Sequence, residues 1–448
     1  MTRFFIAFLI AAAAALAPGA AEAIPAFSKK YEVACSACHS SWPRLNDYGM
    51  KFKINGYQLP DSEDGGQTAK LNPGAGNLFL DIGKANPPIS MAMDGGITLL
   101  QSEKALAGDR NNQFFCCVNG VSVTADMGGT VAPNIAYWLS LPWGKEDVSQ
   151  ANLRFVNWFG PGLFGMDIGA MKVVDYDVVG AGREWFGSPL FAFYGHPGNS
   201  ASGEMGMTAV HNDTGVRVYG RPSFGMFSYE AGMYTGSQLT SMGEDDADKA
   251  FTAMGRVDTE KVAVSLRYWT NKTGLMDQTV TTADGQTLVF AADKRNPDET
   301  TQEIILSARY RHPYFEVDAT LDRVSFTMTD SELTSSDGTV HTLSMSGINR
   351  TGISVSALWF VNNWMETGLT YGQSKYSDYD QTVDGIRTAY TGYPVSMFQW
   401  RLLIKPAANM KLAFEAQVDT SSEDSRKRSD GTSADPDNKF ILQWSMSL

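Results

Sequence analysis

Apolar and polar residues alternate along most of the chain, from about residue 88 to the C-terminus. In residues 440–448, Phe440, Leu442, Trp444, Met446 and Leu448 lie at every second position. Because successive side chains of a β-strand point to opposite faces, such segments predict strands with one apolar and one polar face. The polar face carries many charges, which is typical of a barrel with lipid outside and a polar lumen.

We therefore predict an all-β fold, an antiparallel transmembrane β-barrel of about 16 strands over residues 88–448. A soluble antiparallel β-sandwich would show the same alternation. The charged polar face and the alternation of short turns with long loops favour the barrel. The expected strands are 88–101, 113–127, 134–143, 150–159, 163–174, 210–221, 224–235, 249–258, 261–271, 299–311, 314–328, 340–361, 364–375, 391–404, 409–419 and 438–448. The long loop near 175–209 is a candidate to fold into the lumen.

The N-terminus has the three parts of a secretory signal. Arg3 is followed by an unbroken apolar run over residues 4–17, and small residues at Ala21 and Ala23 form an A-x-A cleavage site. A membrane anchor is the alternative, but the run is shorter than the roughly 20 residues that a spanning helix needs. We expect residues 1–23 to be a cleaved signal peptide. No later run is long enough to span as a helix, so a membrane form of the mature chain needs a closed barrel.

Residues 35–39 read Cys35-Ser36-Ala37-Cys38-His39, the C-x-x-C-H pattern that attaches c-type haem. The two thiols bond covalently to the porphyrin, and the adjacent histidine binds the iron. A structural zinc site would need a fourth ligand nearby, and none follows in the next fifty residues. A thioredoxin-like redox pair would need a βαβ context, which the following segment lacks. The motif predicts one covalent haem c, with Cys35 and Cys38 as attachment sites and His39 as the proximal iron ligand.

The haem module is predicted to be small, residues 24–60, with one short helix after His39. Ser41 is the expected N-cap, Pro43 lies in the first turn and Gly56 is the expected stop. Residues 61–87 are predicted to be a linker, because residues 61–77 are polar and rich in glycine. The sixth iron ligand is left open, with these candidates: Met50, Met91, Met93 and His196.

The net charge of the chain excludes nucleic acid as a partner. The chain has 49 acidic and 36 basic residues, a formal net charge of −13, which argues against nucleic-acid binding.

Two further motifs carry no function in this interpretation. Residues 160–165 match G-x-G-x-x-G, but another strand follows instead of a helix, so we interpret them as a hairpin turn. The pair Cys116-Cys117 is either a strained disulfide or two small apolar residues, without a catalytic role.

The haem motif and the residues after it resemble the fused monohaem cytochrome–porin family of outer-membrane proteins. The residues that carry the resemblance are Cys35, Cys38, His39, Trp42-Pro43, Leu45, Gly49, Phe52 and Asn55-Gly56-Tyr57. Residues 156–173 also resemble an early hairpin of that family. The resemblance implies a haem module in or beneath a porin-like barrel, in the outer membrane of a Gram-negative bacterium. The best-described members oxidise ferrous iron.

Three hypotheses about function follow. In the first, an extracellular donor such as Fe(II) reduces a haem in or under the lumen, and a periplasmic cytochrome or another carrier accepts the electron. In the second, the barrel is a diffusion porin and the haem module is a plug or redox sensor. In the third, electrons flow outward to an extracellular acceptor.

The long loops carry an excess of acidic residues, such as Glu244-Asp245-Asp246-Ala247-Asp248, which would either keep the surface soluble or attract a cation.

Overall fold

The computed structural model describes the following residues: 27, 31, 33–41, 44–59, 89–101, 113–116, 122–132, 134–142, 150–178, 212–236, 249–272, 278–281, 287–290, 300–327, 331–334, 340–345, 347–362, 364–392, 394–407, 410–423 and 438–447. The predicted signal peptide (1–23) and linker (61–87) lie outside them. None of the helices in this part of the chain is long and apolar enough to cross a membrane.

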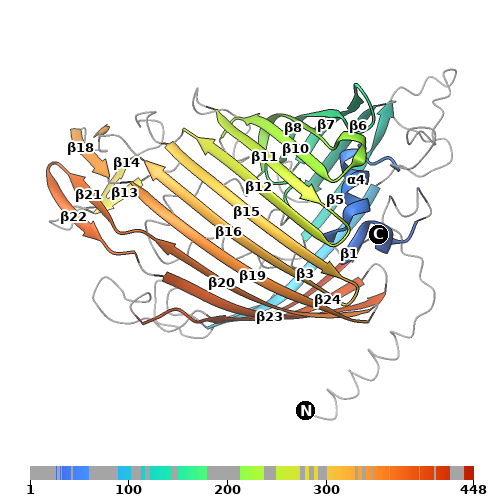
Figure 1. The fold of residues 1–448 in the computed structure, drawn as a ribbon. Coiled ribbons are helices and arrows are strands. Elements are labelled where there is room, and N and C mark those ends of the chain that lie inside the picture. Colours follow the sequence, from blue (N-terminus) through green and yellow to red (C-terminus); the bar gives the residue numbers. More distant parts are fainter. Residues whose placement is uncertain are drawn as a thin grey trace, which may run out of the picture.

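The described strands close into one antiparallel barrel (Figure 1). Strands β4 (Gln113–Cys116) and β5 (Ser122–Ala132) both pair with β3 (Ile89–Gln101). They therefore share one strand position in the barrel wall, and the barrel has sixteen strand positions. Strand β3 also pairs with β25 (Asn438–Ser447), which closes the ring. The other barrel strands are β6 (Ile135–Pro142), β7 (Gln150–Trp158), β8 (Phe164–Lys172), β9 (Asn212–Gly220), β10 (Phe227–Tyr234), β11 (Ala250–Asp258), β12 (Val262–Asn271), β15 (Thr300–His312), β16 (Phe315–Thr327), β19 (Ile348–Asn362), β20 (Met365–Tyr376), β23 (Pro394–Ala407) and β24 (Met410–Asp419).

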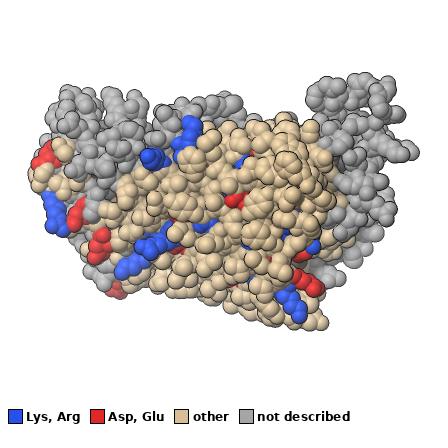
Figure 2. Space-filling view, turned by 45° about the horizontal axis from the view of Figure 1, so that its top comes forward, with Lys and Arg blue, Asp and Glu red and all other residues tan. Residues whose placement is uncertain are grey.

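The alternating apolar and polar residues of each strand lie on the outer and inner surfaces of the barrel, respectively. Along β11, Phe251 and Val257 are exposed on the outer surface, while Thr252 and Arg256 are buried on the inner one. Figure 2 shows an outer wall that is mostly uncharged, with charged side chains sparse over its middle. A closed barrel with an apolar outer band and a charged interior is the architecture of transmembrane β-barrels. The prediction of a 16-strand barrel is confirmed.

Two predicted strands differ from those in the structure. The segment 340–361 is divided into β18 (Val340–Met345) and β19, and only β19 belongs to the barrel. The segment 113–127 is divided into β4 and β5, whose registers against β3 differ by three residues. Alternation alone hides both breaks, because it gives the face of each residue without its pairing partner.

Two ends of the barrel differ in their connections. At one end, the short-turn end, successive strands are joined by turns such as 159–163 and 313–314, and the C-terminus lies there (Figure 1). At the other end the connections are long. They hold the hairpin β13 (Gln278–Thr281)–β14 (Thr287–Phe290) and a sheet of β17 (Ser331–Thr334), β18, β21 (Tyr379–Val383) and β22 (Ile386–Tyr390). Some of the predicted long loops thus contain strands of their own.

Candidate functional site: a plug with a haem motif in the barrel lumen

The C-x-x-C-H residues form one compact turn, here called the attachment turn (residues 35–39). Helix α3 (Cys35–Cys38) begins and ends at the two cysteines, and His39 begins strand β1 (His39–Ser41). Strand β1 pairs with β2 (Arg44–Leu45), with His39 opposite Leu45. The two cysteines are one helical turn apart along the backbone and the histidine follows directly, which is the spacing that the predicted haem c requires. Among the described residues, no group of three or more His, Cys, Asp and Glu converges as in a metal site.

The helix after the motif, α4 (Asp47–Ile54), begins later than predicted. Its N-cap is Asn46, whose side chain accepts a hydrogen bond from the backbone N of Gly49 at 2.8 Å. Ser41 lies instead in β1, because residues 39–41 pair with residues 44–45 as two short strands, and the predicted first-turn residue Pro43 lies outside the described residues. The predicted stop is confirmed: Gly56 has φ +66°, and the amides of Gly56 and Tyr57 bond to the carbonyls of Lys53 and Phe52.

The described part of the module lies inside the short-turn end of the barrel, and we call it the plug (residues 33–41 and 44–59; Figure 1). Arg44 forms ion pairs of 2.9 Å with Glu316 and 2.5 Å with Asp318, both on the inner face of β16. On another side of the lumen, Asp47 pairs with Arg221, which follows β9, at 2.5 Å. These pairs join the plug to walls that are far apart in the sequence.

Close packing adds to the ion pairs of the plug. Asn55 accepts a hydrogen bond from Asn157 at 2.7 Å, and a Cβ on Gly56 would lie 3.1 Å from side chains of β6 and β7. Tyr57 packs against Trp138 at a ring distance of 5.3 Å and lies under the guanidinium of Arg154 at 4.9 Å. Aromatic contacts and one cation–π contact therefore exclude water from this side of the plug.

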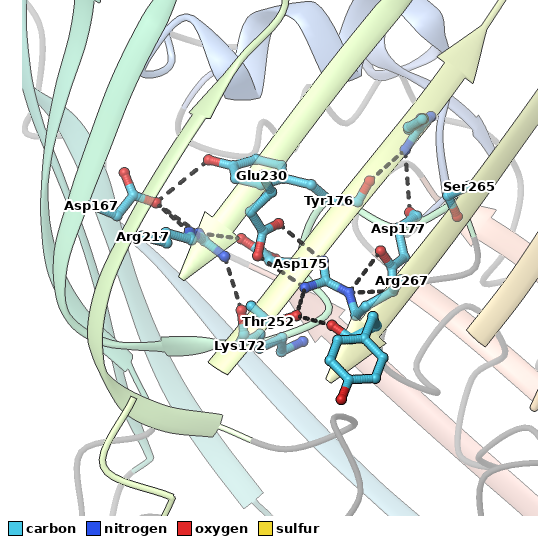
Figure 3. Close-up of polar contacts among 12 residues, drawn as sticks. Asp167, Lys172, Asp175, Tyr176, Asp177, Arg217, Glu230, Thr252, Ser265 and Arg267 are labelled. Carbon is cyan, nitrogen blue, oxygen red and sulfur yellow. Dashed lines mark hydrogen bonds and ion pairs between the residues drawn. The ribbon is translucent and has the colours of Figure 1, made fainter. Parts of the chain in front are cut away.

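The start of the predicted inward-folding loop does lie in the lumen. Residues 173–178, here called the inner segment, follow β8 and run along the inner wall (Figure 3). Arg267 binds Asp177 from one side at 2.9 Å and Glu230 from another at 3.0 Å. The backbone N of Val178 donates to Ser265 at 3.0 Å. For these described residues the prediction is confirmed, and the rest of the loop lies outside the described range.

The inner segment touches the plug through Asp175. Its carboxylate pairs with Lys53 of α4 at 2.6 Å and with Arg217 at 3.2 Å, and Arg154 lies 3.6 Å away. Burial alone would raise the pKa of the Asp175 carboxyl, but Lys53, Arg217 and Arg154 outweigh burial and hold that pKa well below its usual range. Burial lowers the pKa of Lys53, and the two arginines oppose the pull of Asp175 on it. The excess of cations therefore favours the charged carboxylate more than the charged ammonium.

The candidates for the sixth ligand lie in different places. Met50 is buried in a cluster with Ile54, Tyr176, Tyr219 and Met254, between the plug and the wall. Met91 is 37% exposed on the outer face of β3, and Met93 shares that face by alternation. His196 lies outside the described residues. Of the three described candidates, only Met50 is on the plug.

Sequence reasoning missed several residues that build the site. Arg44, Asn46 and Asp175 position the plug, and Met254 adds a second methionine beside Met50. Asn before a helix whose first residue is Asp is an N-cap signal that points to Asn46. The pairs Arg44–Glu316 and Lys53–Asp175 carry no local signal, since their members lie 272 and 122 residues apart in the sequence.

No family model matches the sequence, and no curated protein matches it. Solved structures of outer-membrane proteins are similar in fold. OmpT of Vibrio cholerae has a TM-score of 0.50 at 13% identity, over 80% of this chain and 97% of that one. An anion-selective porin from Comamonas acidovorans gives 0.49 and 10%, over 80% and 99%. The channel DcaP of Acinetobacter baumannii gives 0.49 and 11%, over 80% and 96%. At such identities the likeness concerns the barrel fold alone.

Proposed function

We propose that this chain is an outer-membrane c-type cytochrome built into a porin-like barrel, and that it transfers single electrons between an extracellular donor and a periplasmic carrier. One observation carries the proposal: the attachment turn is part of a plug with buried ion pairs inside the short-turn end of the barrel. The resemblance of residues 27–60 to the fused cytochrome–porin family supports the same function. We place the short-turn end in the periplasm, as in bacterial barrels.

The chemistry asked of the site is simple. A haem c at the attachment turn supplies one-electron transfer, in which extracellular Fe(II) is oxidised to Fe(III) and the electron leaves to a periplasmic cytochrome or another carrier. The chain itself has to hold the turn at a fixed depth and limit water around it. Arg44 and Asp47 perform the first task through ion pairs to the walls, and Lys53 through its ion pair with the inner segment. The aromatic side chains around Tyr57 perform the second.

Two measurements test this function. The mass of the mature wild-type protein should show one haem adduct, which Cys35→Ala and Cys38→Ala should reduce or abolish. His39→Ala should keep the adduct and change the visible spectrum. The barrel should still migrate as a heat-modifiable band in all three variants, because its own strands hold it together. A wild-type protein without haem would end the proposal.

The donor is tested by stopped-flow mixing of the oxidised protein with Fe(II) while the haem spectrum is recorded. Reduction within the mixing experiment supports inward electron flow from Fe(II). The midpoint potential then separates inward from outward flow, because a carrier can accept electrons only from a site of lower potential. A haem that Fe(II) fails to reduce, with a potential well below that of the donor, would favour export to an extracellular acceptor.

The second candidate is a diffusion porin in which the haem plug serves as a stopper or sensor. The barrel itself favours it, since sixteen strands enclose a lumen wide enough for solutes. The plug and the inner segment oppose it, because both occupy that lumen. Single-channel conductance in a planar bilayer decides between them. A conductance like that of an open porin in the intact protein would support diffusion. A conductance that stays low in both the oxidised and the reduced protein would support the electron-transfer function, because a stopper or sensor has to open the lumen in one of its states.

A further inference from the structure

Asn46 lies between the attachment turn and α4, and it bonds to both. Its Oδ1 accepts from the backbone N of Gly49 at 2.8 Å, which caps the helix. Its Nδ2 donates to the carbonyl O of Ala37 at 2.9 Å, with a longer contact of 3.4 Å to that of Ser36. Its backbone N donates to the carbonyl O of Cys38 at 3.0 Å. One residue thus holds three consecutive carbonyls of the attachment turn.

Gly49 brings the two segments into direct backbone contact. A Cβ at this position would lie 2.1 Å from the carbonyl O of Cys38 and 3.0 Å from the side chain of Leu45. The first turn of α4 therefore packs on the backbone of Cys38 itself, and a side chain larger than hydrogen would force the two apart. We call Asn46 and Gly49 the clasp.

We propose that the clasp orients His39 toward the haem iron, with Asn46 as a positioning residue. His39 follows Cys38 directly, so a rotation of the Cys38 peptide redirects the imidazole. The clasp fixes the peptides on both sides of Cys38. The Nδ2 of Asn46 holds the carbonyl O of Ala37, whose peptide leads into Cys38. The backbone N of Asn46 and the contact with Gly49 hold the carbonyl of Cys38, whose peptide leads into His39. Groups that orient a metal ligand typically change metal binding by about 10–100-fold when they are removed. This inference rests on the proposed function, since it requires a haem at the turn.

A purely structural role for Asn46 would be the capping of α4. Capping uses Oδ1 and Gly49 only, whereas the bond from Nδ2 to Ala37 lies outside the helix. The two roles are therefore separable by substitution. Asn46→Ser keeps a neutral N-cap of similar strength, but the hydroxyl is too short to reach Ala37. Asn46→Ala removes both bonds. Asn55→Ser is the matched control, because Asn55 makes its bonds to Gln58 and Asn157 at the other end of α4.

The experiment compares the full-length wild-type protein and these three variants in detergent. Mass spectrometry checks that haem is attached, and the ferric spectrum and the midpoint potential report on His39 ligation. We expect the ratio of unligated to His39-ligated haem to rise about tenfold in Asn46→Ser and in Asn46→Ala, with a shifted potential in both. Asn55→Ser should match the wild type. An Asn46→Ser protein with the wild-type spectrum and potential would overturn the inference. A wild-type protein without haem would instead refute the proposed function.

Discussion

Arg44 is only 2% exposed, and its ion pairs to Glu316 and Asp318 are buried as well. We expect Arg44→Gln to lower the free energy of unfolding by about 3–5 kcal/mol, because it leaves two buried carboxylates without that cation. Urea titration followed by the heat-modifiable gel band measures the loss. The plug should also become accessible to added protease, while the barrel stays closed.

A substitution at Lys51, on the same plug, tests whether the burial of an ion pair determines its contribution to stability. Lys51 pairs with Asp47 at 3.0 Å, but both side chains are more than a quarter exposed. Lys51→Gln should therefore cost no more than about 1 kcal/mol. An equal loss for Lys51→Gln and Arg44→Gln would show that the buried ion pairs do not hold the plug.

At the residue scale, the sequence predicted which side of the barrel a side chain faces better than it predicted which residues that side chain contacts. Alternation assigned the polar positions of the strands to the lumen correctly, as at Thr252 and Arg256 of β11, because a strand repeats every two residues. It could not predict that Arg44 meets β16 or that Asn46 rather than Ser41 caps the helix. The contact of Arg44 depends on the closed barrel, which no local pattern encodes. The choice of N-cap follows from the β1–β2 pairing, which keeps Ser41 in a strand and leaves Asn46, with its local N-cap signal, to begin the helix. The haem attachment itself stays a prediction from the motif.

The turn between β7 and β8 contains a glycine that both its backbone angle and a close contact require. Gly162 has φ +64°, and a Cβ there would lie 2.4 Å from the carbonyl O of Arg221, whose backbone N donates to the carbonyl O of Gly162. Gly162→Ala should cost of order 1–3 kcal/mol through backbone strain alone. Gly255→Ala is the control, since nothing lies within 4 Å of its Cβ position and its φ is ordinary. Thermal unfolding of the two variants gives the comparison, and equal midpoints would contradict the strain.

The contact between the plug and the inner segment is measurable as a coupling energy. A double-mutant cycle of Lys53→Met and Asp175→Asn should give a coupling of about 0.5–3 kcal/mol, because their side chains are 2.6 Å apart. A cycle of Lys51→Gln and Asp175→Asn should give almost none. If both cycles were additive, the two elements would be independent.

The same pair predicts a pH dependence. Burial opposes ionisation of Asp175, but Lys53 and the two arginines keep its folded pKa well below the unfolded value. The carboxylate therefore contributes its full stability above about pH 4, the usual carboxyl pKa, and loses it as the pH falls toward the lower folded value. The free-energy loss of Asp175→Asn should be constant above that pH and shrink below it. A loss that grows on acidification would contradict this assignment.

At the scale of the whole molecule, the acidic residues of the long loops should raise the rate at which Fe(II) associates with the protein. The segment 244–248 lies in one of the predicted long loops and carries four acidic residues. Neutralising Glu244, Asp245, Asp246 and Asp248 should slow haem reduction by Fe(II) at low ionic strength, because charged surfaces can speed association by about 10–1000-fold. The difference should vanish at high salt, where screening is strong. An unchanged low-salt rate would leave these residues with a role in solubility alone.

The ion pairs of the plug also set an order of assembly. Arg44 meets Glu316 across 272 positions of sequence, and Asp47 meets Arg221 across 174. The plug is synthesised early, yet its neighbours exist only after most barrel strands have been made and paired. The predicted haem attachment would require reachable thiols, which places it before the wall closes around the plug. Biogenesis of this protein would then proceed from cofactor to barrel, and a delay in haem supply would leave the barrel to close around an empty turn.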